Sequence, residues 1–420
     1  MKKINLLYDA TTICKILTNN SSRSGIFFVA YNVLLEFLKR EDLNVYLYSS
    51  KPVKLLQVIN QYKEFSKCKI YKPILSTYGN FLAQKLGENK NKPLRLFYSL
   101  QASILKKLYK FYLNYFVSVD DIDVYFSPMY AVPDFIKRKQ GIIKYTILHD
   151  AIPLVNDYRQ SIIHKWFYKL LDSLNSTDKY FANSEYTKED FLKYVPQIKP
   201  DNITVIPLST GKPYFKLDDT MYINQIKRKY GIPTDKKYIF SLCNLDPRKN
   251  LIFAVKNFLH FAEKNNLDDF IFVLGGSHFK DFESILNKNM ENLGENQKRI
   301  LRIGYVEDED MSALYSGAEM FVYPSLYEGF GIPVLEAMKC GLPVICSNLT
   351  SLPEVIGNCG IQINPYSDNE LVCAMEKMYY DRDFREECVR KGLERAKLFT
   401  WKKCVDVIES QIKKDLGYEK

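Results

Sequence analysis

The sequence predicts an α/β protein built from two successive units, each with its own parallel sheet. Apolar strand-like runs alternate with helical patterns along the whole chain, as they do in parallel α/β sheets. The chain has 420 residues, more than one core usually serves, and its 46% hydrophobic and 26% charged residues are typical of a globular protein. No apolar run reaches the roughly 18–20 residues of a membrane span, and the N-terminus shows no signal-peptide pattern.

The first half contains six strand-like runs and two clear helical patterns. We expect strands at Ile4–Asp9, Val45–Ser49, Val124–Ser127, Ile142–His149, Tyr180–Asn183 and Thr204–Leu208. We expect helices at Ile26–Lys39 and at Glu185–Tyr194, the second of which has Ser184 as a suitable N-cap.

The alternation begins anew at Lys237. We expect strands at Tyr238–Cys243, Phe270–Leu274, Ile300–Tyr305, Met320–Tyr323, Val344–Cys346 and Gly360–Ile363. The helical patterns between them include Leu251–Lys264, Met311–Ser316, Val334–Cys340 and Asn369–Tyr380.

The junction between the units is expected at Ile206–Phe215, which contains two prolines and a glycine. A last helical pattern, Lys402–Lys414, follows after the strands are used up, and such a helix often packs back on the first unit. We therefore predict a first domain over residues 1–205, a second over 206–395, and a C-terminal helix over 396–420 that returns to the first domain.

Positive charge is concentrated in one segment of the chain. The net charge is +10, yet residues 51–119 hold thirteen Lys or Arg and only two acidic residues, which makes this segment +11. Such a patch can serve nucleic acid, anionic lipid or an anionic substrate, or it can be solvated surface alone. No recognised nucleic-acid module accompanies it, so we expect no nucleic-acid partner.

The cysteines and one acidic motif bear on metal binding. Nine cysteines are scattered without a CxxC pair, which indicates reduced thiols in a cytosol and not a zinc site. Asp121 and Asp123 have the Asp-x-Asp spacing of a metal motif, but they precede an expected strand and so lie at the wrong sheet edge for a ligand. We expect a solvated turn there and no catalytic metal.

The most informative stretch runs from Tyr323 to Pro343. A strand ends near Pro324, a glycine-containing loop follows, and Pro333 stands where the first helical turn should begin. Glycines before a helix N-terminus let a ligand approach backbone N–H groups, which suits phosphate. Glu328 and Glu336 flank this site, and carboxylates are better suited to accept hydrogen bonds from hydroxyl groups. A diphosphate with a diol at each end, as in a nucleotide sugar, satisfies both demands.

In this stretch the sequence resembles the retaining glycosyltransferases of family four, which have the GT-B fold of two Rossmann-like domains whose parallel sheets face across a cleft. Glu328 and Glu336 match the E-x7-E motif of that family. The resemblance implies that Glu336 holds the ribose hydroxyls of the donor and that Glu328 contacts the donor hexose. The donor-binding backbone would be that of Gly329, Phe330, Gly331 and Ile332.

A second motif, Asn244 to Leu251, follows the first strand of the second unit. Arg248 and Lys249 stand at a helix N-terminus, where cations are unfavourable unless an anion compensates them. In the family, the matching basic pair neutralises the leaving diphosphate, and Lys249 is the first choice for that role. The chain has Asn244 where many members have Arg, so one diphosphate contact is expected to be weaker or to come from elsewhere.

Two further sites are expected in the first unit. His149 and Asp150 end an apolar strand, at the sheet edge where open α/β sheets bind ligands. Members of the family often use a residue here at the donor hexose or the acceptor site, although a structural histidine is also possible. The loop Thr18–Gly25 corresponds to the family's glycine-rich loop; it keeps one glycine, Gly25, and Arg23 could meet an anionic acceptor.

The resemblance as a whole implies a retaining, metal-independent hexosyltransferase without a cofactor. A mannose-type donor is favoured, with a GDP-sugar first and a UDP-sugar next, and a glycan or lipid-linked acceptor in bacterial surface polysaccharide synthesis. Two alternatives stay open, a nucleotide-sugar epimerase of the same fold and a non-catalytic glycan-binding protein. The expected location is cytoplasmic.

Residues 94–116 combine aromatic and basic side chains in a helical pattern. Its Leu, Ile, Phe and Tyr residues recur on one side, and Lys106, Lys107 and Lys110 lie on another. Such a helix can lie on the anionic leaflet of a membrane. Packing of the apolar residues on the first sheet is an equally good interpretation, because helices must cover both faces of a parallel sheet.

Overall fold

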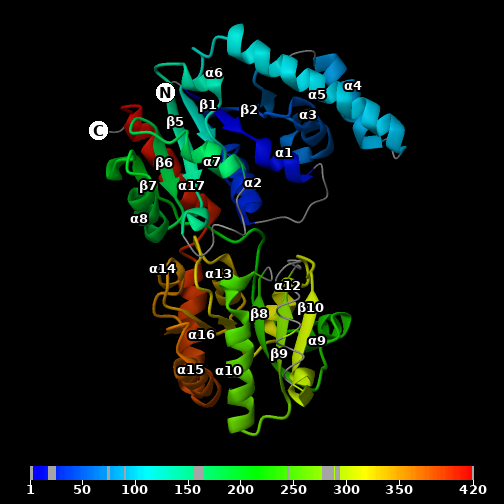
Figure 1. Ribbon diagram of the computed structural model, residues 1–420, viewed down its shortest axis with the longest axis vertical. Coiled ribbons are helices and arrows are strands. Elements are labelled where there is room, and N and C mark those ends of the chain that lie inside the picture. Colours follow the sequence, from blue (N-terminus) through cyan, green and yellow to red (C-terminus); the bar gives the residue numbers. More distant parts are fainter. Residues whose placement is uncertain are drawn as a thin grey trace. The chain divides into compact units, whose positions relative to one another are not determined.

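The computed structural model describes residues 3–17, 25–72, 76–88, 91–155, 165–243, 246–276, 288 and 294–418. The chain divides into two compact units, whose elements are labelled in Figure 1. The N-terminal unit comprises residues 1–183, 188–211 and 401–420, and the C-terminal unit comprises residues 184–187 and 212–400.

The N-terminal unit contains a seven-stranded parallel sheet with the order β3-β2-β1-β4-β5-β6-β7. Its strands are β1 Ile4–Asp9, β2 Leu43–Tyr48, β3 Lys69–Ile70, β4 Val124–Ser127, β5 Ile143–Leu148, β6 Lys179–Ala182 and β7 Ile203–Val205. Every residue of β4 is buried, as expected of a central strand covered on both faces.

Helices surround this sheet. They are α1 Thr11–Leu17, α2 Gly25–Phe37, α3 Pro52–Gln61, α4 Ser76–Glu88, α5 Lys92–Tyr115, α6 Asp134–Lys137, α7 Lys165–Leu171, α8 Glu185–Tyr194 and α17 Trp401–Asp415. The C-terminal helix α17 contacts α2. Arg40, just beyond α2, lies 2.6 Å from Asp406 and 3.3 Å from Glu409, so charge pairs and buried apolar contacts together hold α17 on this unit.

The C-terminal unit contains a six-stranded parallel sheet with the order β10-β9-β8-β11-β12-β13. Its strands are β8 Lys237–Leu242, β9 Phe270–Gly275, β10 Ile300–Gly304, β11 Met320–Tyr323, β12 Val344–Ser347 and β13 Ile361–Ile363. Its helices are α9 Thr220–Lys229, α10 Leu251–Lys264, α12 Met311–Ser316, α13 Ile332–Lys339, α14 Leu352–Ile356, α15 Asp368–Tyr380 and α16 Arg382–Ala396.

The expected strands are all present, with boundaries that shift by at most three residues, and β1, β4 and β11 coincide with the expected ranges. The sequence analysis did not identify the short strand β3 or the helices α1, α3, α4, α6, α7, α9, α14 and α16. Ser184 is the N-cap of α8 as expected, because its hydroxyl accepts a hydrogen bond from the backbone N–H of Thr187 at 3.0 Å. Within the described ranges, no helix has the length and apolar character needed to cross a membrane.

Candidate active site

The sheet of the C-terminal unit reverses its winding direction between β8 and β11. In open α/β sheets, ligands bind beyond the carboxyl ends of the strands at such a point. The loop after β8 contributes Arg248 and Lys249, and the loop after β11 contributes Glu328. The two motifs singled out in the sequence therefore meet at the position where this fold places its ligands.

Lys249 and Glu328 form a buried ion pair at this point. The Lys249 Nζ donates to Glu328 Oε1 at 2.5 Å and to the Tyr323 hydroxyl at 2.8 Å. Glu328 Oε1 also accepts from Tyr323 at 2.9 Å and from the Ser325 hydroxyl at 2.6 Å. Lys249 is 8% and Glu328 9% exposed, so the pair is preorganised and largely shielded from water.

Arg248 is held beside this pair by local backbone structure. Asp246 caps the short 3-10 turn Pro247–Lys249 by accepting from the Arg248 N–H at 2.9 Å. The guanidinium Nη1 donates to the Tyr327 carbonyl at 2.8 Å and lies 3.9 Å from Glu328 Oε2. Asn250 ends the turn in the left-handed region, with φ 56°, where asparagine is tolerated. Both cations are thus fixed at the amino end of α10.

The two cations keep Glu328 ionised. Burial would raise the pKa of this carboxyl, but the charges of Lys249 and then Arg248 outweigh burial and lower its pKa below the ordinary value. The backbone around Glu328 is also tied down, since its N–H donates to Thr350 Oγ1 at 3.1 Å and its carbonyl accepts from Ser351 Oγ at 3.0 Å. The carboxylate is therefore rigid and negatively charged.

The loop before α13 reaches the helix N-terminus through a backbone conformation that requires glycine. Gly331 is the N-cap residue and has φ 104°, a conformation that residues with a side chain rarely adopt. A Cβ at this position would lie 2.5 Å from Leu352 Cδ2. The Gly329 carbonyl accepts from Ser184 and Thr187 hydroxyls at 2.8 and 3.1 Å, so it is not a ligand contact. Phe330 packs on Phe399, and Ile332 begins α13.

Glu336 lies one turn into α13 and has a different environment. It is 7% exposed, and Tyr315 donates a hydrogen bond to its Oε2 at 2.9 Å. Tyr214 is hydrogen bonded to it as well. Burial raises the pKa of Glu336 to about 7, against the two hydrogen bonds that lower it. The two glutamates of the motif thus differ: Glu328 is a paired carboxylate, and Glu336 gains or loses a proton near neutral pH.

Four polar side chains of the site were not identified from the sequence. Tyr323 and Ser325 bind Glu328, and Tyr315 and Tyr214 bind Glu336. Tyr323 and Ser325 belong to the motif stretch itself, so their closeness to Glu328 in the sequence could have identified them as its partners. Tyr214 and Tyr315 come from the unit junction and from α12, and nothing in their local sequence marks them.

His149 and Asp150 lie at the carboxyl end of β5 in the N-terminal unit. The His149 Nε2 is 2.6 Å from the Pro128 carbonyl, so this nitrogen carries the proton and donates. Burial lowers the pKa of His149 to about 4, which makes the imidazole neutral at pH 7. Asp150 Oδ1 accepts from the Ile152 N–H at 3.2 Å and orders the following turn. At this position the chain therefore offers a neutral hydrogen-bonding imidazole.

The remaining predicted positions are one glycine, two positions outside the described residues and the Asp-x-Asp pair. Gly25 is exposed and begins α2. Arg23, with the rest of its loop, and Asn244 lie outside the described residues. Asp121 and Asp123 precede β4. Asp121 lies in a turn and is exposed, as expected, whereas Asp123 is half-buried. The carboxylate of Asp123 accepts from the Asn5 N–H at 2.8 Å, and that of Asp121 accepts from the Tyr71 hydroxyl at 2.9 Å, so both brace the amino end of the sheet. Over the described part of the chain, no cluster of three or more His, Cys, Asp or Glu has a metal-binding arrangement.

Comparison with protein families places this geometry in a known context. The family model described as glycosyl transferases group 1 matches residues 223–395, which include both motifs. Residues 223–395 are a glycosyl transferases group 1 domain. The GT-B fold expected for the whole chain agrees with its two parallel sheets, of seven and six strands.

Proteins similar in sequence to this chain include several bacterial mannosyltransferases. The chain is 29% identical over 283 residues to the O-antigen chain mannosyltransferase B of Escherichia coli, which covers 67% of this chain and 71% of that protein. It is 30% identical over 259 residues to the serotype-specific mannosyltransferase WbdA of Escherichia coli, of which it spans only 31%. It is 27% identical over 232 residues to the O-antigen chain mannosyltransferase RfbU of Salmonella typhimurium, with coverage of 55% and 59%.

Solved structures share the fold over nearly the whole chain. Sucrose-phosphate synthase from Thermosynechococcus elongatus has a TM-score of 0.66 at 16% identity, with coverage of 99% of this chain and 100% of that one. Anabaena Alr3699/HepE, solved in complex with UDP-glucose, has a TM-score of 0.63 at 15% identity, with the same coverage. At these identities the likeness concerns the fold alone.

Proposed function

We propose that this protein is a retaining, metal-independent glycosyltransferase that moves a hexose from a nucleotide-diphosphate sugar to a glycan or lipid-linked acceptor in bacterial surface polysaccharide synthesis. The observation that carries the proposal is the meeting of Arg248 and Lys249 with Glu328 at the switch point of the group 1 domain, with Glu336 in the helix that follows Glu328 in the chain. Mannose is the proposed sugar because the O-antigen relatives are named as mannosyltransferases. GDP-mannose is the first donor to test, and a UDP-hexose is the next.

The proposed roles follow from charge and hydrogen-bonding capacity. Glu336 would accept hydrogen bonds from the two ribose hydroxyls, and Glu328 would accept from a hydroxyl of the hexose. Lys249 and Arg248 would face the diphosphate, whose negative charge grows as the glycosidic bond breaks. The N–H groups at the start of α13 would add to this positive potential.

The reaction we propose is a front-face displacement. The acceptor hydroxyl oxygen forms a bond to the anomeric carbon on the side from which the diphosphate departs. The bond from that carbon to the phosphate oxygen breaks, and the hydroxyl proton passes to the departing phosphate oxygen. The protein then acts chiefly by positioning both substrates and by stabilising charge on the leaving group.

A transfer assay with separate binding measurements tests this proposal. Wild-type protein should transfer labelled mannose from GDP-mannose to an acceptor in a bacterial lipid extract. Glu328→Gln should reduce turnover by at least a hundredfold, which raises the activation barrier by about 2.7 kcal/mol or more. Glu319→Gln is the matched control, because Glu319 belongs to the same unit and pairs with Arg385 at 3.4 Å away from the motifs. Formation of an epimer without acceptor would instead favour the epimerase, and tight glycan binding without turnover would favour the binding protein.

We further propose that the protein works at the cytoplasmic face of a membrane as a peripheral protein. Helix α5 supports this proposal, because the two interpretations of residues 94–116 apply to different faces of it. Leu105, Tyr109 and Leu113 are buried against the N-terminal unit. Other apolar residues of α5 remain exposed, which is unusual for a helix that only covers a sheet.

A further inference from the structure

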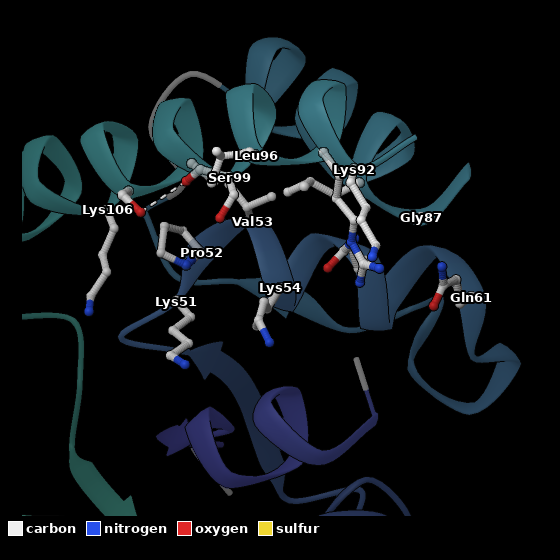
Figure 2. A pocket seen from close by; sticks show the side chains of 15 residues that line it. Lys51, Pro52, Val53, Lys54, Gln61, Gly87, Lys92, Leu96, Ser99 and Lys106 are labelled. Carbon is white, nitrogen blue, oxygen red and sulfur yellow. Dashed lines mark hydrogen bonds between the residues drawn. The ribbon is translucent and has the colours of Figure 1, made fainter. Parts of the chain in front are cut away.

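A pocket of about 930 Å³ lies between α3, the end of α4 and α5 in the N-terminal unit, far along the chain from the group 1 domain. Figure 2 shows it from close by, with α5 running across it. Its lining includes five cations, Lys51, Lys54, Lys92, Arg95 and Lys106, which we call the cationic pocket. None of the described residues that line it is acidic.

The cations are placed where the backbone already makes the potential positive. Lys51 and Lys54 flank the first turn of α3, and Lys92 and Arg95 lie in the first turn of α5. Neither helix has an acidic residue in its first turn. Cations near a helix N-terminus are unfavourable, since that end carries partial positive charge. Two such helix starts that share one pocket need an anion to balance them.

The ammonium groups also repel one another. Burial, followed by the charges of Lys15 and Lys106, lowers the pKa of Lys51. Burial, followed by Lys51, lowers the pKa of Lys54, and Arg95 contributes as well. In Figure 2 the side chains of Lys51, Lys54 and Lys106 extend in the same direction. A ligand with several negative oxygens close together, such as a phosphate or diphosphate ester, complements this arrangement.

The same helix presents an apolar stripe on another face. Phe97, Leu100, Ile104, Leu108, Phe111 and Tyr115 recur at spacings of three and four residues, so they share one side of α5. Each is between 48% and 65% exposed. We call these six residues the apolar stripe. An amphiphile with a phosphate head and a hydrocarbon tail, lodged in a membrane, matches the pocket and the stripe together.

We propose that the cationic pocket binds the phosphate or diphosphate group of a lipid while the apolar stripe enters the surrounding membrane. The pocket opens next to Lys51, which follows β2 at the carboxyl edge of the N-terminal sheet, where ligands of open sheets bind. The inference deepens the proposed function, and rests on it only in treating this lipid as the acceptor side of the reaction.

Vesicle binding tests the proposal without any donor nucleotide. The probe is phosphatidylcholine vesicles that carry either phosphatidic acid, a phosphomonoester, or phosphatidylglycerol, a phosphodiester, at matched surface charge. We expect the protein to bind the phosphatidic acid vesicles at least fivefold more tightly. The pocket variant Lys92→Gln, Arg95→Gln, Lys106→Gln changes only exposed residues and should lose most of this binding, since each cation is expected to contribute about fivefold.

The control variant is Lys63→Gln, Lys169→Gln, Lys199→Gln, which removes the same charge from exposed positions of the N-terminal unit outside the pocket. Its affinity for the phosphatidic acid vesicles should fall by less than threefold. Equal losses in the two variants would mean diffuse attraction to an anionic surface and would overturn the proposal. So would equal affinity of the wild type for the two kinds of vesicle, or no binding to either at low salt.

A second arm separates a lipid phosphate from a soluble one. Calorimetry with inorganic pyrophosphate measures the pocket as the binding that the pocket variant loses, because Arg248 and Lys249 can also hold a diphosphate. The stripe variant Phe97→Ser, Leu100→Ser, Ile104→Ser should keep that binding while it loses the vesicles. Pyrophosphate binding that the pocket variant loses, without vesicle binding in the wild type, would identify a soluble ligand and refute the lipid. Because the variants compared in both arms leave the group 1 domain unchanged, these outcomes are independent of whether that domain binds a nucleotide sugar.

Discussion

The pKa of about 7 at Glu336 predicts that donor binding depends on pH. If the ribose hydroxyls donate to the ionised carboxylate, the proton on Glu336 must leave before the donor binds tightly. A carboxyl with this pKa is about one tenth ionised at about pH 6 and about nine tenths ionised at about pH 8. Donor affinity should therefore rise about tenfold over this range, equivalent to about 1.4 kcal/mol.

Isothermal titration with an intact nucleotide sugar measures this effect cleanly. A nucleoside diphosphate is unsuitable, because its terminal phosphate titrates near pH 6 and would give its own pH dependence. The diphosphate of a nucleotide sugar is esterified at both ends and has no such proton. Glu336→Gln is the control: it should bind more weakly at about pH 8, by ~2 kcal/mol for a lost charged acceptor, and its affinity should not change with pH.

Stability gives an independent measurement on the free protein. A carboxyl whose pKa is raised from 4.5 to about 7 binds more protons folded than unfolded, so the free energy of unfolding falls as pH rises through this window. The slope should be at most about 1.4 kcal/mol per pH unit and should be absent from Glu336→Gln. This account of Glu336 would be refuted if the donor affinity of the wild type did not change between about pH 6 and about pH 8. It would also be refuted if the free energy of unfolding of Glu336→Gln fell with pH as steeply as that of the wild type.

Three further predictions concern the rest of the site. Lys249→Met should abolish transfer. It should also lower the free energy of unfolding, measured by urea titration, by ~3 kcal/mol, because Arg248 is then the one, more distant, cation that the described residues place beside the buried Glu328 carboxylate. A variant as stable as the wild type would contradict this. Gly331→Ala should lower the free energy of unfolding by ~1–3 kcal/mol in the same titration, because of the positive φ and the contact of the new Cβ with Leu352. The control Gly231→Ala should lower it less, because Gly231 also has a positive φ but has open space around it. Transfer should persist after exhaustive dialysis against EDTA, and loss of activity that Mg²⁺ or Mn²⁺ restores would exclude a metal-independent mechanism.

Much of the fold was predictable because its strands are buried on both faces. A run such as Met320–Tyr323, entirely apolar and aromatic, is recognisable without any partner. Two-residue β3 and the polar helix α16 carry too little pattern to be recognised. The spacing of the two glutamates was also visible, since it lies within one loop and helix.

The ion pair at the centre of the site was not predictable in the same way. Lys249 and Glu328 are 79 residues apart, and only the strand order brings β8 beside β11. The sequence analysis assigned Lys249 to the diphosphate and Glu328 to the sugar without seeing that they bind each other. The difference between the two glutamates likewise depends on tertiary structure, because burial raises the pKa of Glu336 while the charges of Lys249 and Arg248 outweigh burial and lower that of Glu328.

The strand order of the C-terminal unit also determines when the site forms during folding. Strands β8, β9 and β10 follow one another in the chain and are neighbours in the sheet, but β11 must return past two strands to reach β8. Closing that long loop is a late and entropically costly step. Until β11 arrives, Lys249 stays hydrated, and its burial coincides with the arrival of Glu328. A nascent chain that ends before β11 therefore contains Arg248 and Lys249 without Glu328, and we expect it to expose the edge of β8 to other strands.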